Sequence, residues 1–353
     1  MPQQTLPQAA NPAALTEALR HAGVLPDGHV VEIHIESDQP TILSRILRLR
    51  LSYDRPAPDA PATVFLKTGL PGKNDGVWNS SRQEVGFYTT IAPALPSDIV
   101  PRCFSARYDD DTDDWHLLLQ DLTDTHVRVT EWPLPPSQPQ CETILSARAR
   151  LHAVWWDHPN LGVTAGTWPD AAAVEDWRQR GTKHYALFAD RLGDNPPPER
   201  RAFCEAFLDA APRLLARLQT RRNVTIVQGD SHVWNCFLPR DGNTGVRFFD
   251  WDAWRPHVPT ADLAYMMALH WYPDRRRRME QPLLDHYHHA LLANGITGYD
   301  RSALDDDYRW AVLMQLRIPI SQAAYQIPPV IWWNHLERIM MAVDDFGCRE
   351  FLK

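Results

Sequence analysis

The sequence reads Val-Gln-Gly-Asp-Ser-His-Val-Trp-Asn over residues 227–235 and Val-Arg-Phe-Phe-Asp-Trp-Asp over residues 246–252. Three polar residues stand at fixed intervals in these stretches: Asp230, then Asn235 five positions later, then Asp250 after a short apolar segment. Carboxylate and amide oxygens are the ligands that hard cations such as Mg²⁺ take. An ionised aspartate can also accept a proton. The order of these residues therefore indicates a site that handles both a cation and a proton.

The spacing is typical of the catalytic loop of protein kinases. There an aspartate accepts the proton of the substrate hydroxyl, an asparagine five positions later binds Mg²⁺, and a second aspartate after a short strand binds Mg²⁺ as well. By this interpretation Asp230 is the catalytic residue, and Asn235 and Asp250 are the metal ligands. A P-loop is excluded, because the positions that would need Gly and Ser or Thr hold Lys67 and Asn74.

Two upstream residues complete the pattern. Lys67 closes a predicted strand, and Glu84 follows 17 residues later on a predicted helix. A kinase uses such a lysine to hold the α- and β-phosphates of the nucleotide, and such a glutamate to orient the lysine. A strand-end lysine or a helical glutamate alone is usually a solvated surface charge. The ordered set favours a nucleotide site with Lys67 and Glu84 among its residues.

The predicted elements divide the chain into a sheet-rich first part and a helical second part. The first part has expected strands at 30–36, 47–51, 63–67 and 115–119 and helices at 13–21 and 80–92. The second part has expected helices at 140–155, 170–188 and 199–218 and short strands at 224–227 and 246–249; helices then resume from about residue 260 and continue through 283–293, 303–316 and 329–343. We therefore expect an α+β fold with a small nucleotide-binding lobe, residues 1–122, and a larger helical lobe, residues 123–353, that carries the catalytic loop and the acceptor site.

Composition limits the classes of partner. The chain has 353 residues, with 36 Lys and Arg against 44 Asp and Glu, a net charge of -8 that argues against binding nucleic acid. The sequence contains no run of about 18 apolar residues, so we expect no membrane span. The start of the chain lacks the pattern of a signal peptide. The five scattered cysteines suggest neither a disulfide framework nor a structural zinc site, so we expect a cytoplasmic protein.

With these residues the sequence resembles the aminoglycoside phosphotransferase and choline kinase superfamily, and especially its ecdysteroid-kinase-like branch. The resemblance spans about residues 40–295 and rests on the Gly-Asp-x-x-x-x-Asn loop at 229–235 and the Asp-Trp pair at 250–251. It implies a bilobal protein-kinase-like fold, ATP and Mg²⁺ as cofactors, and a small-molecule acceptor with a hydroxyl group, such as an antibiotic, a sugar-like compound or an amino alcohol. It also implies that Gln120, Asp121 and Leu122 form the hinge that contacts the nucleotide.

The sequence departs from this family at two places. The family usually has His before Gly-Asp, where this chain has Gln228, which cannot carry a proton charge. The turn expected to cover the phosphates, residues 37–44, contains no glycine. These departures support an alternative, a catalytically inactive kinase-like module that binds nucleotide.

Candidates for acceptor recognition are carboxylates and tryptophans of the helical part. They offer charge, stacking and cation–π contacts, although tryptophans on helices are more often core residues. His232, inside the loop, is expected either near the acceptor or in packing. The helical candidates are Asp305, Asp306, Asp307, Trp310, Trp332, Trp333 and Glu337.

Overall fold

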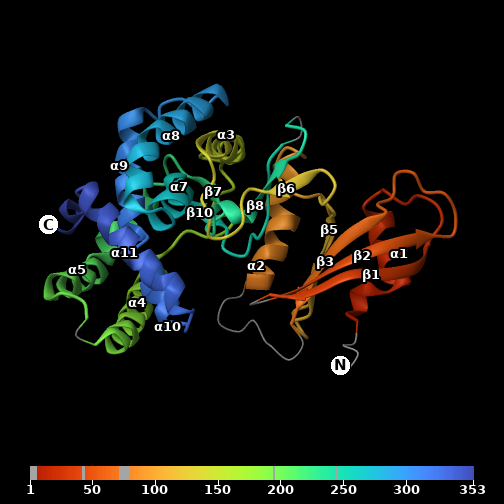
Figure 1. Ribbon diagram of the computed structural model, residues 1–353, viewed down its shortest axis with the longest axis horizontal. Helices are drawn as coiled ribbons and strands as arrows, with labels where there is room; N and C mark the ends of the chain where they lie inside the picture. The colour runs from red at the N-terminus through yellow and green to blue at the C-terminus, as the bar shows by residue number, and fades with distance from the viewer. Residues whose placement is uncertain (1–5, 42–43, 71–79, 194, 243–244) are drawn as a thin grey trace. The chain divides into compact units, whose positions relative to one another are not determined.

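The computed structural model describes residues 6–41, 44–70, 80–193, 195–242 and 245–353 (Figure 1). The chain forms two compact units: unit 1 comprises residues 1–128 and 236–253, and unit 2 comprises residues 129–235 and 254–353. These compact units do not test the functional lobes expected at residues 1–122 and 123–353, so the two lobes stay a prediction. Within the described residues, no helix has the length and apolar character needed to cross a membrane.

Unit 1 is built on an antiparallel sheet whose strands run in the order β1-β2-β3-β5-β4. Alternation explains the sheet, because Leu47, Leu49 and Leu51 point to one face and are buried while the residues between them are arginines. In β3, Leu66 points to the same core and Lys67 to the opposite face. The strands are β1 (Val30–Pro40), β2 (Ser44–Tyr53), β3 (Thr63–Gly69), β4 (Cys103–Tyr108) and β5 (Trp115–Gln120).

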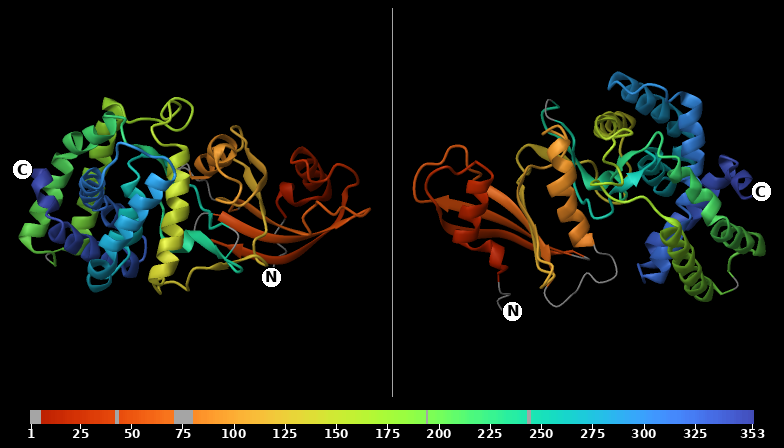
Figure 2. Two further views of the ribbon diagram at one scale, coloured as in Figure 1. Left: turned by 90° about the horizontal axis from the view of Figure 1, so that it is seen from above. Right: turned by 180° about the vertical axis from the view of Figure 1, so that it is seen from behind.

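Two helices cover the opposite faces of this sheet (Figures 1 and 2). Helix α1 (Pro12–His21) begins where the Asn11 side chain accepts the amide of Ala14, and its leucines pack on the core face. Helix α2 (Ser80–Gly86) faces the side of Lys67 and continues as a π-helical turn, Phe87–Ile91, and a 3₁₀ turn, Ala92–Ala94. A smaller sheet has the order β6-β8-β9, with β6 (His126–Arg128), β8 (Cys236–Pro239) and β9 (Arg247–Phe248).

Unit 2 is mainly helical. Its short strands β7 (Thr225–Val227) and β10 (Arg255–His257) pair antiparallel, and β7 leads directly into the loop of Asp230. Helices α3 and α8 pack side by side, as do α4 and α10. The helices are α3 (Gln138–Val154), α4 (Ala171–Leu192), α5 (Pro198–Asp209), α6 (Ala211–Gln219), α7 (Thr260–Ala264) with its π-helical extension Tyr265–Leu269, α8 (Pro273–Ala293), α9 (Arg301–Met314), α10 (Arg317–Ala324) and α11 (Pro329–Asp345).

The α+β class expected from the sequence is confirmed, and several boundaries differ. The helix expected at 199–218 is two helices, α5 and α6, that meet at Ala210, because Pro212 lies in the first turn of a new helix. Helices resume at Thr260 as expected, with α7, and α8 runs from Pro273 through the expected 283–293 with Pro282 inside it. The sequence of strand β4 alternates little between apolar and polar residues, so its pattern does not predict a strand. The pairing of β4 with β5 in the structure establishes it.

Candidate active site

Unit 1 brings together three of the predicted site residues. The Nζ atom of Lys67 lies 2.7 Å from Oε2 of Glu84 and 2.8 Å from Oδ1 of Asp250. Strand β3 supplies the lysine, α2 supplies the glutamate from the face that it covers, and Asp250 follows β9. The Glu84 side chain is 3% exposed, whereas that of Asp250 is 38% exposed. Asp250 is thus the carboxylate of this group that is open to an incoming ligand.

The charges in this group depend on one another. Burial by itself would lower the pKa of Lys67, but the carboxylates of Asp250 and Glu84 outweigh it and hold that pKa above its ordinary value. Burial raises the pKa of Glu84, with the Lys67 ammonium acting against it. Two carboxylates therefore share a single ammonium group here, an arrangement that a further cation would relieve.

The backbone and a ring stack fix the place of Asp250. Its φ angle is 64°, in the left-handed region that aspartate tolerates better than most residues and that is common where strain serves a site. The next residue, Trp251, is fully buried, stacks on Phe87 with ring centroids 3.8 Å apart, and donates its Nε1–H to the carbonyl of Phe248 at 3.1 Å. The tryptophan anchors the segment to the helical turn that follows α2.

Unit 2 holds the other predicted residues, in the loop that follows β7. Gly229 has a φ angle of 84°, a conformation that favours glycine and turns the chain just before Asp230. The Asp230 carboxylate accepts the Tyr265 hydroxyl on Oδ1 and the Nδ2 amide of Asn235, at 3.0 Å, on Oδ2. Its side chain remains 32% exposed. Asp230 is therefore oriented from two sides while it stays accessible to a ligand.

A buried ion pair supports the loop from behind. Asp262 of α7 is fully buried and pairs with Arg148 of α3, with 2.5 Å between Oδ2 and Nη1. It also accepts the backbone amides of Gln228 and Gly229, each at 3.0 Å. Burial would raise the pKa of Asp262, but the Arg148 charge and these donors hold it well below its ordinary value. Asp262 and Tyr265 lie three residues apart on one helical face, so one helical segment holds the start of the loop, residues 228–230.

Gln228 belongs to this support. It is fully buried, and its Oε1 accepts Nη2 of Arg148 at 3.0 Å. A neutral amide oxygen suits this position, because a protonated histidine there would face the guanidinium of Arg148. The substitution for the family's usual histidine thus has a local structural explanation.

Three imidazoles line the neighbourhood of the loop. His232 has its Nε2 at 3.6 Å from Oδ2 of Asp230, and its ring centroid lies 5.5 Å from that of His270, which in turn lies 4.7 Å from that of His335. Burial and the adjacent charges of Arg338 and His232 lower the pKa of His335 to about 3. His232 also has ring contacts with Trp234, Tyr265 and His270, so both interpretations of this residue stay open.

The predicted hinge residues have contacts within unit 1. The backbone amide of Gln120 donates to the backbone carbonyl of Arg102 at 2.8 Å, and the side-chain Oε1 of Gln120 accepts the backbone amide of Arg102 at 3.3 Å. Asp121 pairs with Arg48 at 2.7 Å, and Leu122 is buried. These contacts fix the segment after β5 and leave its role toward a nucleotide a prediction.

The glycine-free turn is closed by its own polar groups. Thr41 and Ser44 bond each other through their hydroxyls at 2.9 Å, and Asp38 pairs with the buried Arg45 at 2.7 Å. Ile42 and Leu43, which belong to the same stretch of sequence, lie outside the described residues. This turn therefore carries an ion pair and hydroxyl groups at positions where a glycine was expected.

Several of the predicted acceptor residues have structural partners. Asp305 pairs with Arg301. Asp307 accepts Arg217 at 2.7 Å, and Trp310 is buried and donates to the carbonyl of Leu214. Trp332 is buried as well. These contacts favour the packing interpretation for this group.

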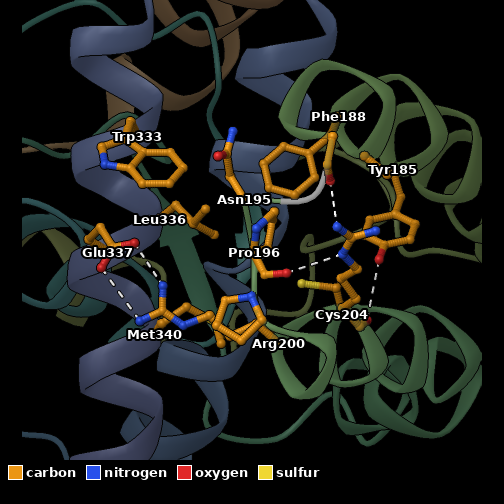
Figure 3. Close-up of a pocket in the computed structure, with 14 residues that line it drawn as sticks. Tyr185, Phe188, Asn195, Pro196, Arg200, Cys204, Trp333, Leu336, Glu337 and Met340 are labelled. Atoms are coloured by element: carbon orange, nitrogen blue, oxygen red, sulfur yellow. Dashed lines mark hydrogen bonds and ion pairs between the residues drawn. The ribbon is translucent and has the colours of Figure 1, made fainter.

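A hollow of about 130 Å³ lies among α4, α5 and α11 (Figure 3). Its wall is largely apolar and includes Phe188, Trp333 and Met340, and Glu337, which also lines it, pairs with Arg200 at 2.7 Å. Two predicted acceptor residues, Trp333 and Glu337, thus line it. Asp230 and the other predicted catalytic and nucleotide-binding residues are not among the described residues that form its wall.

The residue types suit Mg²⁺ held together with a nucleotide. In unit 1, Asp250 offers an exposed carboxylate. In unit 2, Asn235 donates its Nδ2 to Asp230, and its amide oxygen is a ligand type that a hard cation takes. That these two residues hold one cation stays a prediction. Over the described ranges, no group of three or more His, Cys, Asp or Glu side chains forms a metal site of its own. Mg²⁺ is commonly bound by one or two carboxylates plus substrate phosphates, and the pattern fits that mode.

Comparison with known proteins gives a family and a fold. The model of a family described as the phosphotransferase enzyme family matches residues 59–304. A search of curated proteins finds no match. Many solved structures are similar, and the fold is the kinase-like fold that they share. The more specific likeness to the ecdysteroid-kinase-like branch is not among these findings and stays a prediction.

Three solved structures illustrate the similarity. An ethanolamine kinase from Plasmodium vivax has 11% identity and a TM-score of 0.55, over 90% of this chain and 84% of that one. A choline/ethanolamine kinase family protein from Mesorhizobium loti has 11% identity and a TM-score of 0.53, over 98% and 95%. An aminoglycoside phosphotransferase from Streptomyces rimosus, solved with ADP and streptomycin, has 17% identity and a TM-score of 0.50, over 80% and 92%.

Proposed function

Because the chain belongs to the phosphotransferase enzyme family, we propose that it transfers the γ-phosphoryl group of ATP to a hydroxyl group of a small molecule, with Mg²⁺ as cofactor. The observation that carries the proposal is the state of Asp230. Its carboxylate is oriented by Tyr265 and Asn235 and is still accessible, as a group that takes a proton from an acceptor hydroxyl must be.

The remaining residues have roles on the donor side. Lys67 binds the phosphates of the nucleotide, and Glu84 keeps the ammonium group in place from its buried position. Asp250 and Asn235 hold the cation through oxygen atoms. Gln120, Asp121 and Leu122 remain the proposed contacts of the nucleotide base. When bound, Mg²⁺ offsets the negative charge that develops on the transferred group.

In the reaction Asp230 accepts the proton of the acceptor hydroxyl as the new oxygen–phosphorus bond forms. The bond between the γ-phosphorus and the bridging oxygen breaks, and ADP leaves with that electron pair. Positioning and electrostatics supply most of the rate in this chemistry. The products are ADP and a phosphate ester of the acceptor.

Nucleotide binding can be tested without knowledge of the acceptor. Thermal unfolding of the wild type and of Asp250→Asn is measured with ATP or GTP, each with and without Mg²⁺. A ligand at about 100 times its Kd stabilises the folded state by about 2.7 kcal/mol. We expect a Mg²⁺-dependent rise in Tm that is lost in Asp250→Asn and kept in Asp59→Asn, which makes the same change at an exposed position of unit 1.

The alternative, an inactive nucleotide-binding module, gives the same rise in Tm and no product. A screen for phosphate esters in mixtures of hydroxylated compounds therefore separates the two. The absence of any Mg²⁺-dependent rise with either nucleotide at millimolar concentration would contradict both.

A further inference from the structure

The hollow among α4, α5 and α11 is large enough to hold a ligand (Figure 3). Its volume is about 130 Å³. Protein interiors are close-packed and leave few voids larger than a water molecule, so a space of this size is unusual. An apolar cavity of about 150 Å³ stays dry and binds benzene. The hollow therefore has about the size that one six-membered ring needs.

The hollow reaches from the interior of unit 2 to its surface. Phe188, Leu336 and Met340 line it and are buried. Asn195 and Trp333 line it as well, and both are exposed to solvent. A compound in solution can therefore enter on the side of these two residues. A ring bound in the hollow would cover part of the Trp333 indole, and burial of this apolar surface would favour binding.

The wall of the hollow favours an aromatic ring. Phe188 and Trp333 contribute aromatic rings and Met340 a thioether, and both kinds of group make favourable contacts with an aromatic ligand. Cys204 adds no charge to the wall, because burial raises the pKa of its thiol to about 12 and keeps it protonated at neutral pH. The small side chains of Ala189 and Cys204 leave space that larger residues would fill.

One ion pair in the wall defines the polarity that a ligand needs. Nη1 of Arg200 lies 2.7 Å from Oε1 of Glu337, and Nη2 of Arg200 lies 3.5 Å from Oε2. The pair is neutral as a whole and partly buried, so a ligand with a net charge would leave that charge unbalanced. A carboxylate has about four acceptor sites, so Glu337 has capacity for a further donor. A neutral hydroxyl group meets both conditions.

We propose that this hollow is a binding site for a neutral monocyclic phenol. The ring lies against Phe188, Trp333 and Met340, and the hydroxyl group donates to the carboxylate of Glu337. Asp230 and the other predicted catalytic and nucleotide-binding residues are not among the described residues that line the hollow. The inference therefore concerns a site other than the one proposed for phosphoryl transfer and does not depend on that activity.

The test compares four ligands that share a fluorinated ring and differ in one group. Titrations of the full chain are followed by ¹⁹F NMR with 4-fluorophenol, fluorobenzene, 4-fluorobenzoate and 4-fluorobenzylamine, of which the last is a cation at neutral pH. We expect 4-fluorophenol to bind with a Kd in the millimolar range or below, at least fivefold more tightly than the other three. Fluorobenzene isolates the contribution of the hydroxyl group, and the two ions test the requirement for a neutral ligand.

Variants test whether the ligand lies in the hollow. Ala189→Leu fills the space and should weaken binding of 4-fluorophenol at least tenfold, whereas Ala172→Leu, at an exposed position of the same helix, should leave the Kd unchanged. Glu337→Met should weaken binding of 4-fluorophenol at least fivefold and leave that of fluorobenzene within twofold. Glu199→Met, at an exposed position of α5, is its control. Circular dichroism checks the fold of each variant, and Cys204→Met is the second filling variant if Ala189→Leu does not fold.

Four results would overturn the inference. They are no binding of 4-fluorophenol at millimolar concentration, a Kd unchanged in the filling variants, tighter binding of either ion, or equal affinity for 4-fluorophenol and fluorobenzene. The first two would mean that the hollow holds no such ligand, and the last two that Glu337 does not select a neutral hydroxyl group. The thermal unfolding test with ATP and Mg²⁺ is independent of all four, so the failure of one proposal leaves the other standing.

Discussion

The group around Lys67 in unit 1 and the loop of Asp230 in unit 2 differ in how their charges are balanced. At Lys67, one ammonium lies between two carboxylates, so the group has an excess of negative charge and an exposed Asp250. At the loop, each carboxylate is matched by donors: Asp262 by Arg148 and backbone amides, Asp230 by Tyr265 and Asn235. The first group is suited to take up a cation and phosphates, and the second to hold one carboxylate in a fixed orientation.

This difference predicts which substitutions affect ligand binding and which affect folding or the reaction. A ligand completes the charge balance at Lys67, so substitutions there should alter binding more than folding. The charge balance at the loop is internal and buried, so substitutions there should alter folding or the rate of reaction. The expected effects below follow this division.

The largest effect is expected at Asp230. Asp230→Asn removes the proton acceptor and should lower the rate of phosphoryl transfer about 10²- to 10⁴-fold, because general base catalysis contributes about that much. The rate is measured as formation of the phosphate ester. Nucleotide binding, measured as the Mg²⁺-dependent rise in Tm, should persist in this variant. Asp209→Asn, an exposed position at the end of α5, is the control. A rate within a few-fold of wild type would show that Asp230 is not the base.

Arg148→Met tests the buried side of the comparison. It leaves the Asp262 carboxylate without its partner in a fully buried position, and the free energy of unfolding should fall by about 3–5 kcal/mol. Urea unfolding at neutral pH measures the loss. Arg222→Met, at an exposed position, should change stability little. An equal, small loss in both variants would mean that the ion pair does not support the loop.

Tyr265→Phe is a milder probe of how Asp230 is oriented. It deletes one hydrogen bond to a charged group, worth about 1.5–3 kcal/mol, and should lower the rate about tenfold or somewhat more. Stability should change less than in Arg148→Met. The measurement is the initial rate at saturating ATP, with Tyr272→Phe, an exposed tyrosine, as control. An unchanged rate would show that Asn235 alone orients the carboxylate.

The smallest effect concerns His335 and pH. In the unfolded chain a histidine has a pKa near 6.5, and in the fold that of His335 is about 3, so the unfolded state takes up the proton first as the pH falls. Stability from this residue is complete above pH 6.5 and is lost toward pH 3, by about 1.4 kcal/mol per pH unit. Urea unfolding at pH 7 and pH 5 should show a smaller loss for His335→Gln than for wild type. Equal losses would mean that His335 is protonated in the fold.

The sequence predicted the residues that local pattern can reveal. Lys67, Glu84 and Asp250 each adjoin a strand or lie on a helix whose periodicity is evident, and Asp230 and Asn235 share one motif. The sequence could not reveal the supporting contacts, because Arg148 of α3 and Asp262 of α7 are 114 residues apart and meet only in the tertiary structure.

Two features have structural roles that the sequence does not reveal, and the physical reason is the same for both. Gln228 looked like a weakening of the loop, yet its neutral oxygen accepts the buried Arg148, a partner that no local pattern identifies. The predicted acceptor residues Asp307 and Trp310 have their partners, Arg217 and Leu214, on α6, far from them in the sequence. Residues that act through tertiary contacts were therefore the ones that the sequence could not assign.

The most direct test of the central claim is ³¹P NMR of the full chain with ATP, Mg²⁺ and a mixture of hydroxylated small molecules of differing charge. We predict that wild type consumes the γ-phosphate resonance and forms a phosphomonoester resonance, and that Asp230→Asn, which still binds Mg²⁺ and ATP, forms none. Equal ester formation by both proteins, or binding of ATP by wild type with no ester from any acceptor, would contradict the account.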